Sequence, residues 1–514
     1  MKQVFHKILF IITIVLLTLV MVQTLTGFIN FRSLRGAMTL AEMPKLTYKS
    51  YVDNSFQRGF EQYAKDHMGF REWALRLYNQ YVWSCYHTNS NNYILVGKDN
   101  WLYESEFVMD HYESAMYKYT DNPEVMKQTF EKEALRLWKV QELLKEHDVH
   151  IFVNMIPGKD VIFPEYLPEN TEYFEPDGIH AYDYYKKRFD ELGINYIDNV
   201  EIFKKLKNNV DYQLFTKTGT HWSNIASVYV FDSIINYMEA LGNKNITNLQ
   251  IGERYYDKTR EPDDDLGQLL NLALTIKSEP NLYADVTTID DTTAMKPYFI
   301  TIGDSYFWNF VYNIPLDDIF KKHPYWYYNS TIYMDNEHSS TVELDIDQEL
   351  MRADYIMLNY CTVQLYKLGN FFIAKALTHL CYDKHTIDSV ATNVINGIKS
   401  NPEWYQSIVE KAQNQNISVD EALYNDAIYV INLEPENYFE ELKGDQLPVS
   451  RNKNLVKISD GNIISDTDEL QNMINYIYSD ENWLNDLREK AEKNGITLEE
   501  QVNIDARWML SNKE

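Results

Sequence analysis

The chain has 514 residues, and its 76 acidic residues outnumber its 48 basic residues, which gives a net charge of −28. With 45% hydrophobic and 24% charged residues it has a globular composition, which excludes a disordered polymer and a protein with many membrane spans. The acidic excess also argues against a nucleic-acid partner, because phosphate groups are repelled by it. Its three cysteines are too few and too scattered for a disulfide framework or a cysteine-based zinc site.

The first segment of the chain is apolar enough to enter a membrane. No charged residue lies between Lys7 and Arg32, and residues 8–31 are long enough, at about 1.5 Å per residue, to cross a hydrocarbon layer of ~30 Å. A cleavable signal peptide is the alternative, but residues 24–27 match a cleavage site poorly and secretory apolar regions are usually only about 7–15 residues long. We therefore predict an uncleaved, single-pass signal-anchor helix within residues 1–32, with the bulk of the chain outside the cytoplasm.

After this segment the spacing of apolar residues predicts helices and strands in alternation. Helices are predicted over residues 55–81 with an interruption at Gly69, over residues 123–147 and over residues 181–192. Short apolar runs predict buried strands at residues 149–156, 194–197, 298–302 and 355–358. Strands separated by helices are typical of a mostly parallel sheet covered on both faces, so we predict a three-layer α/β fold.

The C-terminal part of the chain contains an internal repeat. The stretch that begins at Trp404 recurs at Trp483, and the offset of 79 residues (483 − 404) is constant through Ala427 and Ala506. Each copy predicts two helices joined by a turn, and two copies are too few for a free-standing solenoid, so we expect them to dock on the body or on each other. The predicted organisation after the anchor is a helical segment at residues 33–95, an α/β domain at residues 96–390 and a helical extension with two repeats at residues 391–514.

The stretch Gly303-Asp304-Ser305 is the most informative for chemistry, because it directly follows the predicted strand at residues 298–302. A strand-to-helix turn here places the Ser305 hydroxyl at the carboxyl edge of the sheet, where the ligand sites of open α/β sheets lie. Backbone N–H groups at the start of a helix are suited to stabilise an oxyanion that develops on an attacked carbonyl group. Ser305 is therefore a candidate nucleophile.

A serine nucleophile needs a base, and His221 is the candidate. It lies in Thr220-His221-Trp222, directly before a predicted helix that Ser223 or Asn224 caps, so its position is expected to be fixed. The alternative for a single histidine is a role in packing or at the surface. The sequence contains no zinc-binding helix motif, paired-cysteine motif or nucleotide-binding glycine loop, so we predict no metal and no cofactor.

In combination these motifs resemble the SGNH hydrolase superfamily, and more narrowly the alginate O-acetylation family of AlgJ and AlgX and the related DHHW proteins. The likeness covers residues 56–377, and further motifs agree in order at residues 66–71, 97–103, 156–159, 265–266 and 354–359. The resemblance implies that Ser305 is the nucleophile and His221 the general base. It also suggests Lys159 as a substrate contact, and Tyr306 and Asp304 are further candidates for that role.

One position departs from the family pattern. The family has Asp-x-His-Trp, in which the aspartate orients the histidine, and this chain has Gly219 at the aspartate position. Because glycine cannot hold the imidazole tautomer, either another acid supplies the contact, or a Ser–His dyad acts alone, or activity is lost. Asp304 is expected to support the turn rather than to replace the acid. The acidic stretch at residues 261–265 is interpreted as a solvated loop, with cation binding as the alternative.

The resemblance implies a membrane-anchored, extracytoplasmic O-acetyltransferase that acetylates a cell-surface or secreted polysaccharide through a serine-acetyl intermediate. It further implies a membrane-bound O-acyltransferase as the partner that supplies acetyl groups, and the polysaccharide as acceptor. A carbohydrate acetylesterase is the first alternative, because water in place of a sugar hydroxyl requires the same residues. A catalytically inactive polysaccharide-binding or scaffold protein is the second alternative, because Gly219 and the repeats are compatible with it.

Overall fold

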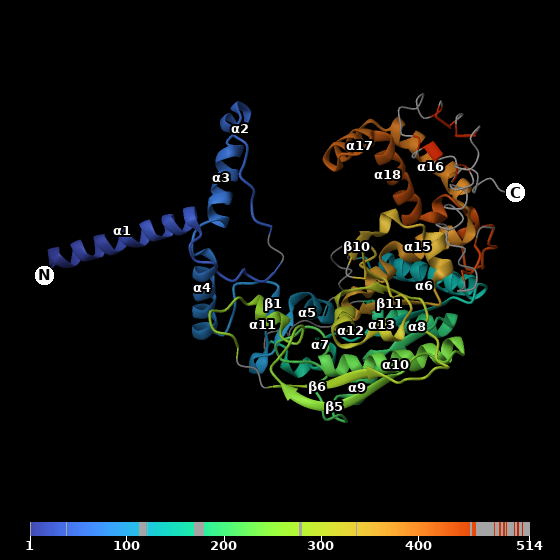
Figure 1. Ribbon diagram of the computed structural model, residues 1–514, viewed down its shortest axis with the longest axis horizontal. Coiled ribbons are helices and arrows are strands. Elements are labelled where there is room, and N and C mark those ends of the chain that lie inside the picture. Colours follow the sequence, from blue (N-terminus) through green and yellow to red (C-terminus); the bar gives the residue numbers. More distant parts are fainter. Residues whose placement is uncertain are drawn as a thin grey trace. The chain divides into compact units, whose positions relative to one another are not determined.

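The computed structural model describes residues 2–36, 39–112, 120, 122–168, 179–276, 280–335, 337–452 and 455–458, together with isolated positions between residues 477 and 506 (Figure 1). The chain forms two compact units, residues 1–454 and residues 455–514. The first unit contains the apolar helix, the α/β body and the first copy of the repeat.

The N-terminal helix α1 (Lys2–Thr26) has apolar residues on all of its faces from Ile8 to Val22 and is therefore not amphipathic there. Its residues Val4–Thr26 are long and apolar enough to cross a membrane, and only 6% of its most apolar window is buried in the protein. A signal sequence has the same length and composition, so the anchor and the signal peptide both stay predictions. The helices α2 (Tyr48–Val52), α3 (Ser55–Asp66) and α4 (Arg71–Tyr86) follow, with Gly69 in the break between the last two.

A seven-stranded sheet forms the centre of the body, in the order β10-β9-β8-β7-β11-β3-β4. The five strands β8, β7, β11, β3 and β4 are parallel neighbours, whereas β9 and β10 extend the sheet by antiparallel pairing. Their bounds are β3 (His150–Ile156), β4 (Tyr196–Asp198), β7 (Phe299–Gly303), β8 (Tyr325–Tyr327), β9 (Thr331–Met334), β10 (Glu337–Ser340) and β11 (Tyr355–Cys361). The predicted α/β class with a mostly parallel sheet is confirmed.

Helices cover both faces of this sheet, with α6 and α15 on one side and α10 on the other (Figure 1). On the first side Phe372 of α15 packs edge-on against Trp326 of β8, at 5.7 Å between ring centroids. On the second side Tyr237 of α10 contacts Phe152 of β3 at 5.4 Å. Because β7 and β11 are buried along their whole length, apolar side chains occupy both of their faces, as in other covered parallel sheets.

The remaining elements connect the strands or extend the body. The helices are α5 (Ser105–Tyr112), α6 (Pro123–Lys145), α7 (Lys159–Ile162), α8 (Ala181–Leu192), α9 (Asn199–Leu206), α10 (Asn224–Gly242), α11 (Asp265–Leu269), α12 (Trp308–Asn313), α13 (Leu316–Ile319), α14 (Ile346–Arg352), α15 (Phe372–Cys381) and α16 (Lys384–Ser400). Two small antiparallel sheets pair β1 (Ile94–Val96) with β2 (Leu102–Glu104) and β5 (Leu249–Asp257) with β6 (Asn281–Thr288).

The first copy of the repeat forms two helices, α17 (Pro402–Gln415) and α18 (Val419–Leu433). Asn416 ends α17 in the left-handed conformation and the Ser418 side chain caps α18, and α18 packs against α15 and α16. The second copy lies mostly outside the described residues. Its described members include a buried cluster that repeats the buried positions of the first copy, with Leu487, Val502 and Ala506 at the places of Ile408, Leu423 and Ala427.

Candidate active site

The turn after β7 fixes Ser305 at the carboxyl end of the sheet. Gly303 lies so close to β11 that a Cβ atom there would come within 2.2 Å of the Asn359 carbonyl oxygen, which explains the glycine. The Asp304 carboxylate accepts hydrogen bonds from the backbone N–H groups of Tyr306 (3.1 Å) and Cys361 (2.6 Å). This carboxylate therefore braces the turn against β11, and Ser305 begins a short 3₁₀ helix, η5 (Ser305–Phe307).

The segment before α10 holds His221 from two sides. Trp222 is fully buried directly behind it, and the Ser223 side chain caps α10 by accepting the Ala226 N–H at 3.1 Å. The Tyr306 hydroxyl donates to the Thr220 carbonyl oxygen at 3.0 Å, and the Tyr306 ring meets the His221 ring edge-to-face at 4.7 Å. The imidazole is therefore positioned by the same turn that carries Ser305.

Ser305, His221 and Asp265 form a continuous hydrogen-bonded line. His221 Nε2 lies 2.9 Å from Ser305 Oγ, and His221 Nδ1 lies 2.6 Å from Asp265 Oδ2. The other carboxylate oxygen of Asp265 accepts the backbone N–H groups of Thr220 (2.8 Å) and Leu266 (2.7 Å), which orients the acid at the start of α11. Burial lowers the pKa of His221, but the charge and hydrogen bond of Asp265 outweigh it, so the pKa is raised. The arrangement has the nucleophile–base–acid geometry of acyl transfer.

Of the three alternatives for the missing acid, the structure shows the first, an acid from elsewhere in the fold. At Gly219 a Cβ atom would come within 2.7 Å of the Asp263 carbonyl oxygen and of Thr216 Oγ1. Residue 219 therefore has no room for a side chain. Asp265, which follows His221 in the sequence whereas Gly219 precedes it, supplies the carboxylate instead. The sequence did not identify Asp265 as the acid, although Asp265-Leu266 is one of the family-like motifs.

A cavity of about 200 Å³ opens onto this line of residues. Ser305, Tyr306 and Asp304 all line it, as do His221 and Asp265. The opposite parts of its wall come from Tyr93, Glu104, Phe107, Tyr327, Tyr328 and Gln364. Tyr306 and Asp304 are each only 1% exposed, and their polar atoms are engaged by the backbone contacts described above. Their predicted contact with a substrate stays a prediction, whereas their contribution to the turn is visible.

Lys159 was expected to contact substrate, but its side chain lies outside the cavity at Ser305. It is 2% exposed, is not part of the cavity wall, and donates to the carbonyl oxygens of Thr216 (3.0 Å), Lys217 (3.3 Å) and Gly219. Its ammonium also lies over the ring of Trp101 at 5.4 Å. Burial lowers the pKa of Lys159 to about 7. The side chain thus holds the loop before His221 in place, and the loop's carbonyl groups explain why a lysine is tolerated there.

The acidic stretch at residues 261–265 is not a solvated loop. Asp263 is 1% exposed and accepts hydrogen bonds from the Asn224 N–H (2.9 Å), Asn281 (3.2 Å) and the Tyr283 hydroxyl (3.2 Å). Among the described residues no group of three metal-ligating side chains gathers here or elsewhere. The stretch is therefore a connection that ties α10, β6 and α11 together and delivers Asp265 to His221.

Residues 94–299 match the family model of the SGNH hydrolase-like domain of the acetyltransferase AlgX. The resemblance predicted from the sequence is therefore confirmed over these residues, which include His221 and Asp265 and end shortly before Ser305. Among curated proteins no match to the chain was found.

Three solved structures are similar to part of this chain. The O-acetyltransferase domain of AlgJ from Pseudomonas putida shares 15% identity, with 55% of this chain and 98% of that chain covered and a TM-score of 0.35. AlgX from Pseudomonas aeruginosa shares 10% identity, with 55% and 68% covered and a TM-score of 0.35. PatB1 from Bacillus cereus shares 13% identity, with 54% and 97% covered and a TM-score of 0.32. At these distances the likenesses do not transfer an activity to this chain.

The packing around Gly219 predicts that restoring the family's aspartate destabilises the AlgX-like domain. We expect Gly219→Asp, and also Gly219→Ala, to lower the free energy of unfolding by about 1–3 kcal/mol, because the Cβ atom overlaps the Asp263 backbone. Urea unfolding of the full chain measures this. Gly397→Ala is the matched control, since nothing lies within 4 Å of a Cβ atom at that exposed position in α16, and it is expected to be neutral or stabilising. Equal stability of the Gly219 variants and the native chain would contradict the account.

Glu104 predicts a pH-dependent stability. It is 9% exposed in the cavity wall, where the Thr220 hydroxyl lies 3.3 Å from its carboxylate, and burial raises the pKa of Glu104 to about 7 from an ordinary value of 4.5. The folded state therefore holds this proton more tightly than the unfolded chain, and stability falls as the pH rises through the window from about 4.5 to about 7.

Glu104→Gln removes this titration. Relative to the native chain, we expect its free energy of unfolding to be higher at pH 8 than at pH 5 by on the order of 2 kcal/mol, as measured by denaturant unfolding at both pH values. The exposed Glu337→Gln on β10 serves as the control and is expected to show no such change. A difference between Glu104→Gln and the native chain that is constant with pH would exclude this account.

Proposed function

We propose that this chain is an O-acetyltransferase that moves acetyl groups onto the hydroxyl groups of a polysaccharide through an acetyl ester on Ser305. The observation that carries the proposal is the line from Asp265 through His221 to Ser305, which ends in a cavity of about 200 Å³. The match of residues 94–299 to the AlgX domain supports acetyl transfer as the reaction class.

In the first half-reaction Ser305 Oγ attacks the carbonyl carbon of the acetyl donor while His221 Nε2 accepts the hydroxyl proton. The imidazolium that forms is stabilised by the Asp265 carboxylate. The backbone N–H of Ser305, at the start of η5, donates to the oxyanion of the tetrahedral intermediate in this proposal. The bond to the leaving group then breaks, the leaving group takes the proton from His221, and the acetyl ester remains on Ser305.

In the second half-reaction a sugar hydroxyl attacks the acetyl carbonyl carbon, and His221 accepts the proton of that hydroxyl. The ester bond to Ser305 Oγ breaks, His221 returns the proton to the serine, and the O-acetyl sugar leaves. Tyr327 and Tyr328 in the cavity wall offer aromatic faces on which a sugar ring can stack.

Because His221 must be neutral to act as the base, activity is expected to fall as the pH drops through the raised pKa of His221.

The proposal includes membrane anchoring by α1 and an extracytoplasmic active site. The length and composition of Val4–Thr26 support the anchor, and an anchored domain stays near a membrane-bound O-acyltransferase that supplies acetyl groups from the other side of the bilayer. The polysaccharide acceptor is part of the same proposal, since the AlgX and AlgJ resemblance suggests this substrate class.

An acceptor assay separates the transferase from a carbohydrate acetylesterase. The full chain is incubated with p-nitrophenyl acetate as donor and increasing concentrations of a neutral oligosaccharide, and the products are analysed by mass spectrometry. For a transferase, acetylated oligosaccharide increases with acceptor concentration at the expense of free acetate. Release of acetate alone, unaffected by the acceptor, would identify an esterase, and no donor consumption would favour the binding or scaffold protein.

A further inference from the structure

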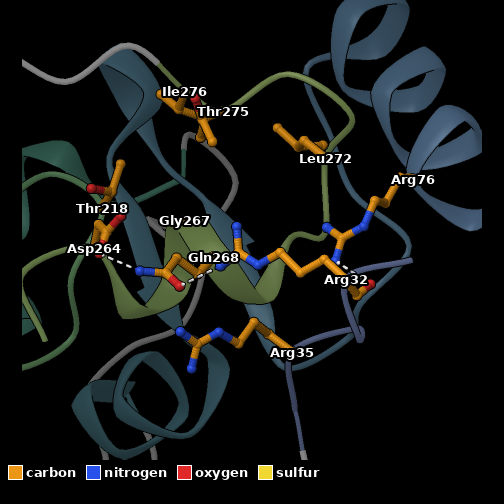
Figure 2. A pocket seen from close by; sticks show the side chains of 10 residues that line it. All are labelled: Arg32, Arg35, Arg76, Thr218, Asp264, Gly267, Gln268, Leu272, Thr275 and Ile276. Carbon is orange, nitrogen blue, oxygen red and sulfur yellow. Dashed lines mark hydrogen bonds between the residues drawn. The ribbon is translucent and has the colours of Figure 1, made fainter. Parts of the chain in front are cut away.

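A second, smaller cavity of about 50 Å³ lies where the segment after α1 meets α4 and α11 (Figure 2). Three arginines line it, Arg32 and Arg35 from the segment that follows α1 and Arg76 from α4. The rest of the wall includes Thr218, Asp264 and Gln268. In a chain of net charge −28, three guanidinium groups around one small cavity are an unusual local excess of positive charge.

Hydrogen bonds hold the backbone around the cavity, while the Arg32 and Arg35 side chains themselves are exposed. The Arg35 backbone N–H donates to the Asn271 side chain at 2.8 Å, and the Asn271 side chain donates back to the Arg35 carbonyl oxygen at 3.0 Å. Arg76 donates to the carbonyl oxygen of Ser33 at 2.9 Å and to that of Arg32 at 3.4 Å. The segment after α1 is therefore fixed on the body on both sides of the cavity.

The charges of these arginines are only partly neutralised. Arg35 pairs with Glu261 at 2.9 Å, but within the part of the chain that the structure describes neither Arg32 nor Arg76 forms an ion pair with a carboxylate. Burial and then the charge of Arg32 lower the pKa of Arg76, and the charge of Glu72 opposes this shift only in part.

Asp264, the acidic residue in the cavity wall, forms its hydrogen bond with an uncharged side chain. The Asp264 carboxylate accepts a hydrogen bond from the Gln268 amide at 2.8 Å, and the Gln268 oxygen in turn lies 3.3 Å from an Arg32 nitrogen (Figure 2). Burial raises the pKa of Asp264, and the hydrogen bond from Gln268 and the charge of Arg35 offset this only in part. Arg32 therefore has one long contact to an uncharged amide oxygen and retains free donors.

We propose that this cavity binds the phosphate group of an anionic membrane phospholipid. Guanidinium groups recognise phosphate through paired, charge-assisted hydrogen bonds, and a volume of about 50 Å³ suits a phosphate group rather than a larger anion. Arg32 follows the end of α1 at Thr26 by only six residues (32 − 26), so it lies within reach of headgroups at a membrane surface that α1 enters. The proposal rests on the placement of α1 in a membrane but not on acetyl transfer.

The cavity lies next to the residues that hold the triad of Ser305, His221 and Asp265, so a bound lipid is expected to affect them. Asp264 and Gly267 line the cavity, and Asp265, which holds His221, lies between them in sequence at the start of α11. A phosphate held by the arginines ties α4, the segment after α1 and α11 together. Bound lipid therefore stabilises the element that presents the triad acid.

The test uses the full chain in dodecyl maltoside and measures the thermal-unfolding midpoint by tryptophan fluorescence. The probes are dihexanoylphosphatidylglycerol, the zwitterionic dihexanoylphosphatidylcholine and inorganic phosphate, at equal concentration and ionic strength. We expect phosphatidylglycerol to raise the midpoint by about 3 °C or more and the other two probes to have much smaller effects. Backbone amides of residues 264–272 are expected to exchange with deuterium more slowly in the presence of phosphatidylglycerol.

Variants assign the effect to the cavity. Arg32→Gln removes one charged contact, so we expect the phosphatidylglycerol concentration that gives half of the midpoint shift to rise by about tenfold. The double variant Arg32→Gln with Arg76→Gln is expected to abolish the midpoint shift. Arg58→Gln, which removes an exposed arginine of α3, is the matched control and keeps the full shift. Within the described residues the Arg32 side chain makes one hydrogen bond, to Gln268, so its single variant tests the site even where the double variant is unstable.

Three outcomes overturn the proposal. An equal shift with inorganic phosphate identifies a free-phosphate site, and an equal shift with phosphatidylcholine identifies an effect of short-chain lipid in general. A shift that persists in the double variant places the binding elsewhere. None of these results depends on acetyl transfer, so failure here and failure of the proposed enzymatic function are distinguishable.

Discussion

Replacement of Ser305 by alanine is expected to reduce acetyl transfer from p-nitrophenyl acetate by about 10⁴-fold or more, to the level left by binding and oxyanion stabilisation alone. The physical reason is that the variant keeps the cavity and His221 but has no oxygen to form the ester. The measurement is kcat for release of p-nitrophenol by the full chain. Ser233→Ala on the exposed face of α10 is the matched control and should retain full activity, since that hydroxyl bonds only to its own helix.

A covalent probe gives a second readout for Ser305 that a folding defect cannot imitate. Phenylmethylsulfonyl fluoride is expected to add one sulfonyl group to the native chain and to the Ser233→Ala control, but none to Ser305→Ala, as read by intact mass. Undiminished turnover or labelling of Ser305→Ala would place the chemistry at another residue and would leave the binding or scaffold alternative as the better account.

Asp265→Asn is expected to lower kcat by about 10³–10⁴-fold while the chain stays folded. The amide keeps the shape of the carboxylate, but it no longer favours the His221 tautomer that offers Nε2 to Ser305, nor does it stabilise the imidazolium. Steady-state kinetics over a range of pH values measure both consequences. Because Asp265 is what raises the pKa of His221, the acid limb of the pH profile should also move to lower pH in the variant.

The control for Asp265→Asn is Asp257→Asn. Asp257 lies in β5 and pairs with Arg260 at 2.6 Å on an exposed surface, so its loss is expected to change kcat by less than about twofold. If Asp265→Asn retained most of the native kcat, the Ser305–His221 pair would be working as a dyad, and the hydrogen bond at 2.6 Å would have an orienting role only.

The sheet could be predicted from the sequence wherever a strand is buried on both faces. The apolar runs at residues 149–156, 298–302 and 355–358 became β3, β7 and β11, and Gly193 ended α8 as a left-handed cap. The strands β5 and β6 were missed, because β5 is largely exposed and its side chains carry no apolar alternation. Pairing of such strands depends on the partner rather than on either sequence.

The site was predictable in part for a similar reason. Ser305 and His221 each sit at a junction between regular elements, and such junctions leave local signals in the sequence. Asp265-Leu266 is a family-like motif, but the motif does not show that this carboxylate contacts His221, which is 44 residues away in sequence (265 − 221) and is brought near by the packing of Asp263 against α10. Lys159 also required the structure, since burial against three carbonyl groups is not visible in its neighbours along the chain.

This chain has Gly219 where the family pattern has an aspartate, and this difference affects how similar sequences are classified. A survey that sorts sequences by the residue two places before the histidine would assign this chain to a group of degenerate members. In this chain a carboxylate from a different loop, that of Asp265, lies 2.6 Å from the imidazole of His221. The absence of one motif residue is therefore weak evidence that a similar protein is catalytically inactive. The loops near the histidine should first be searched for another carboxylate.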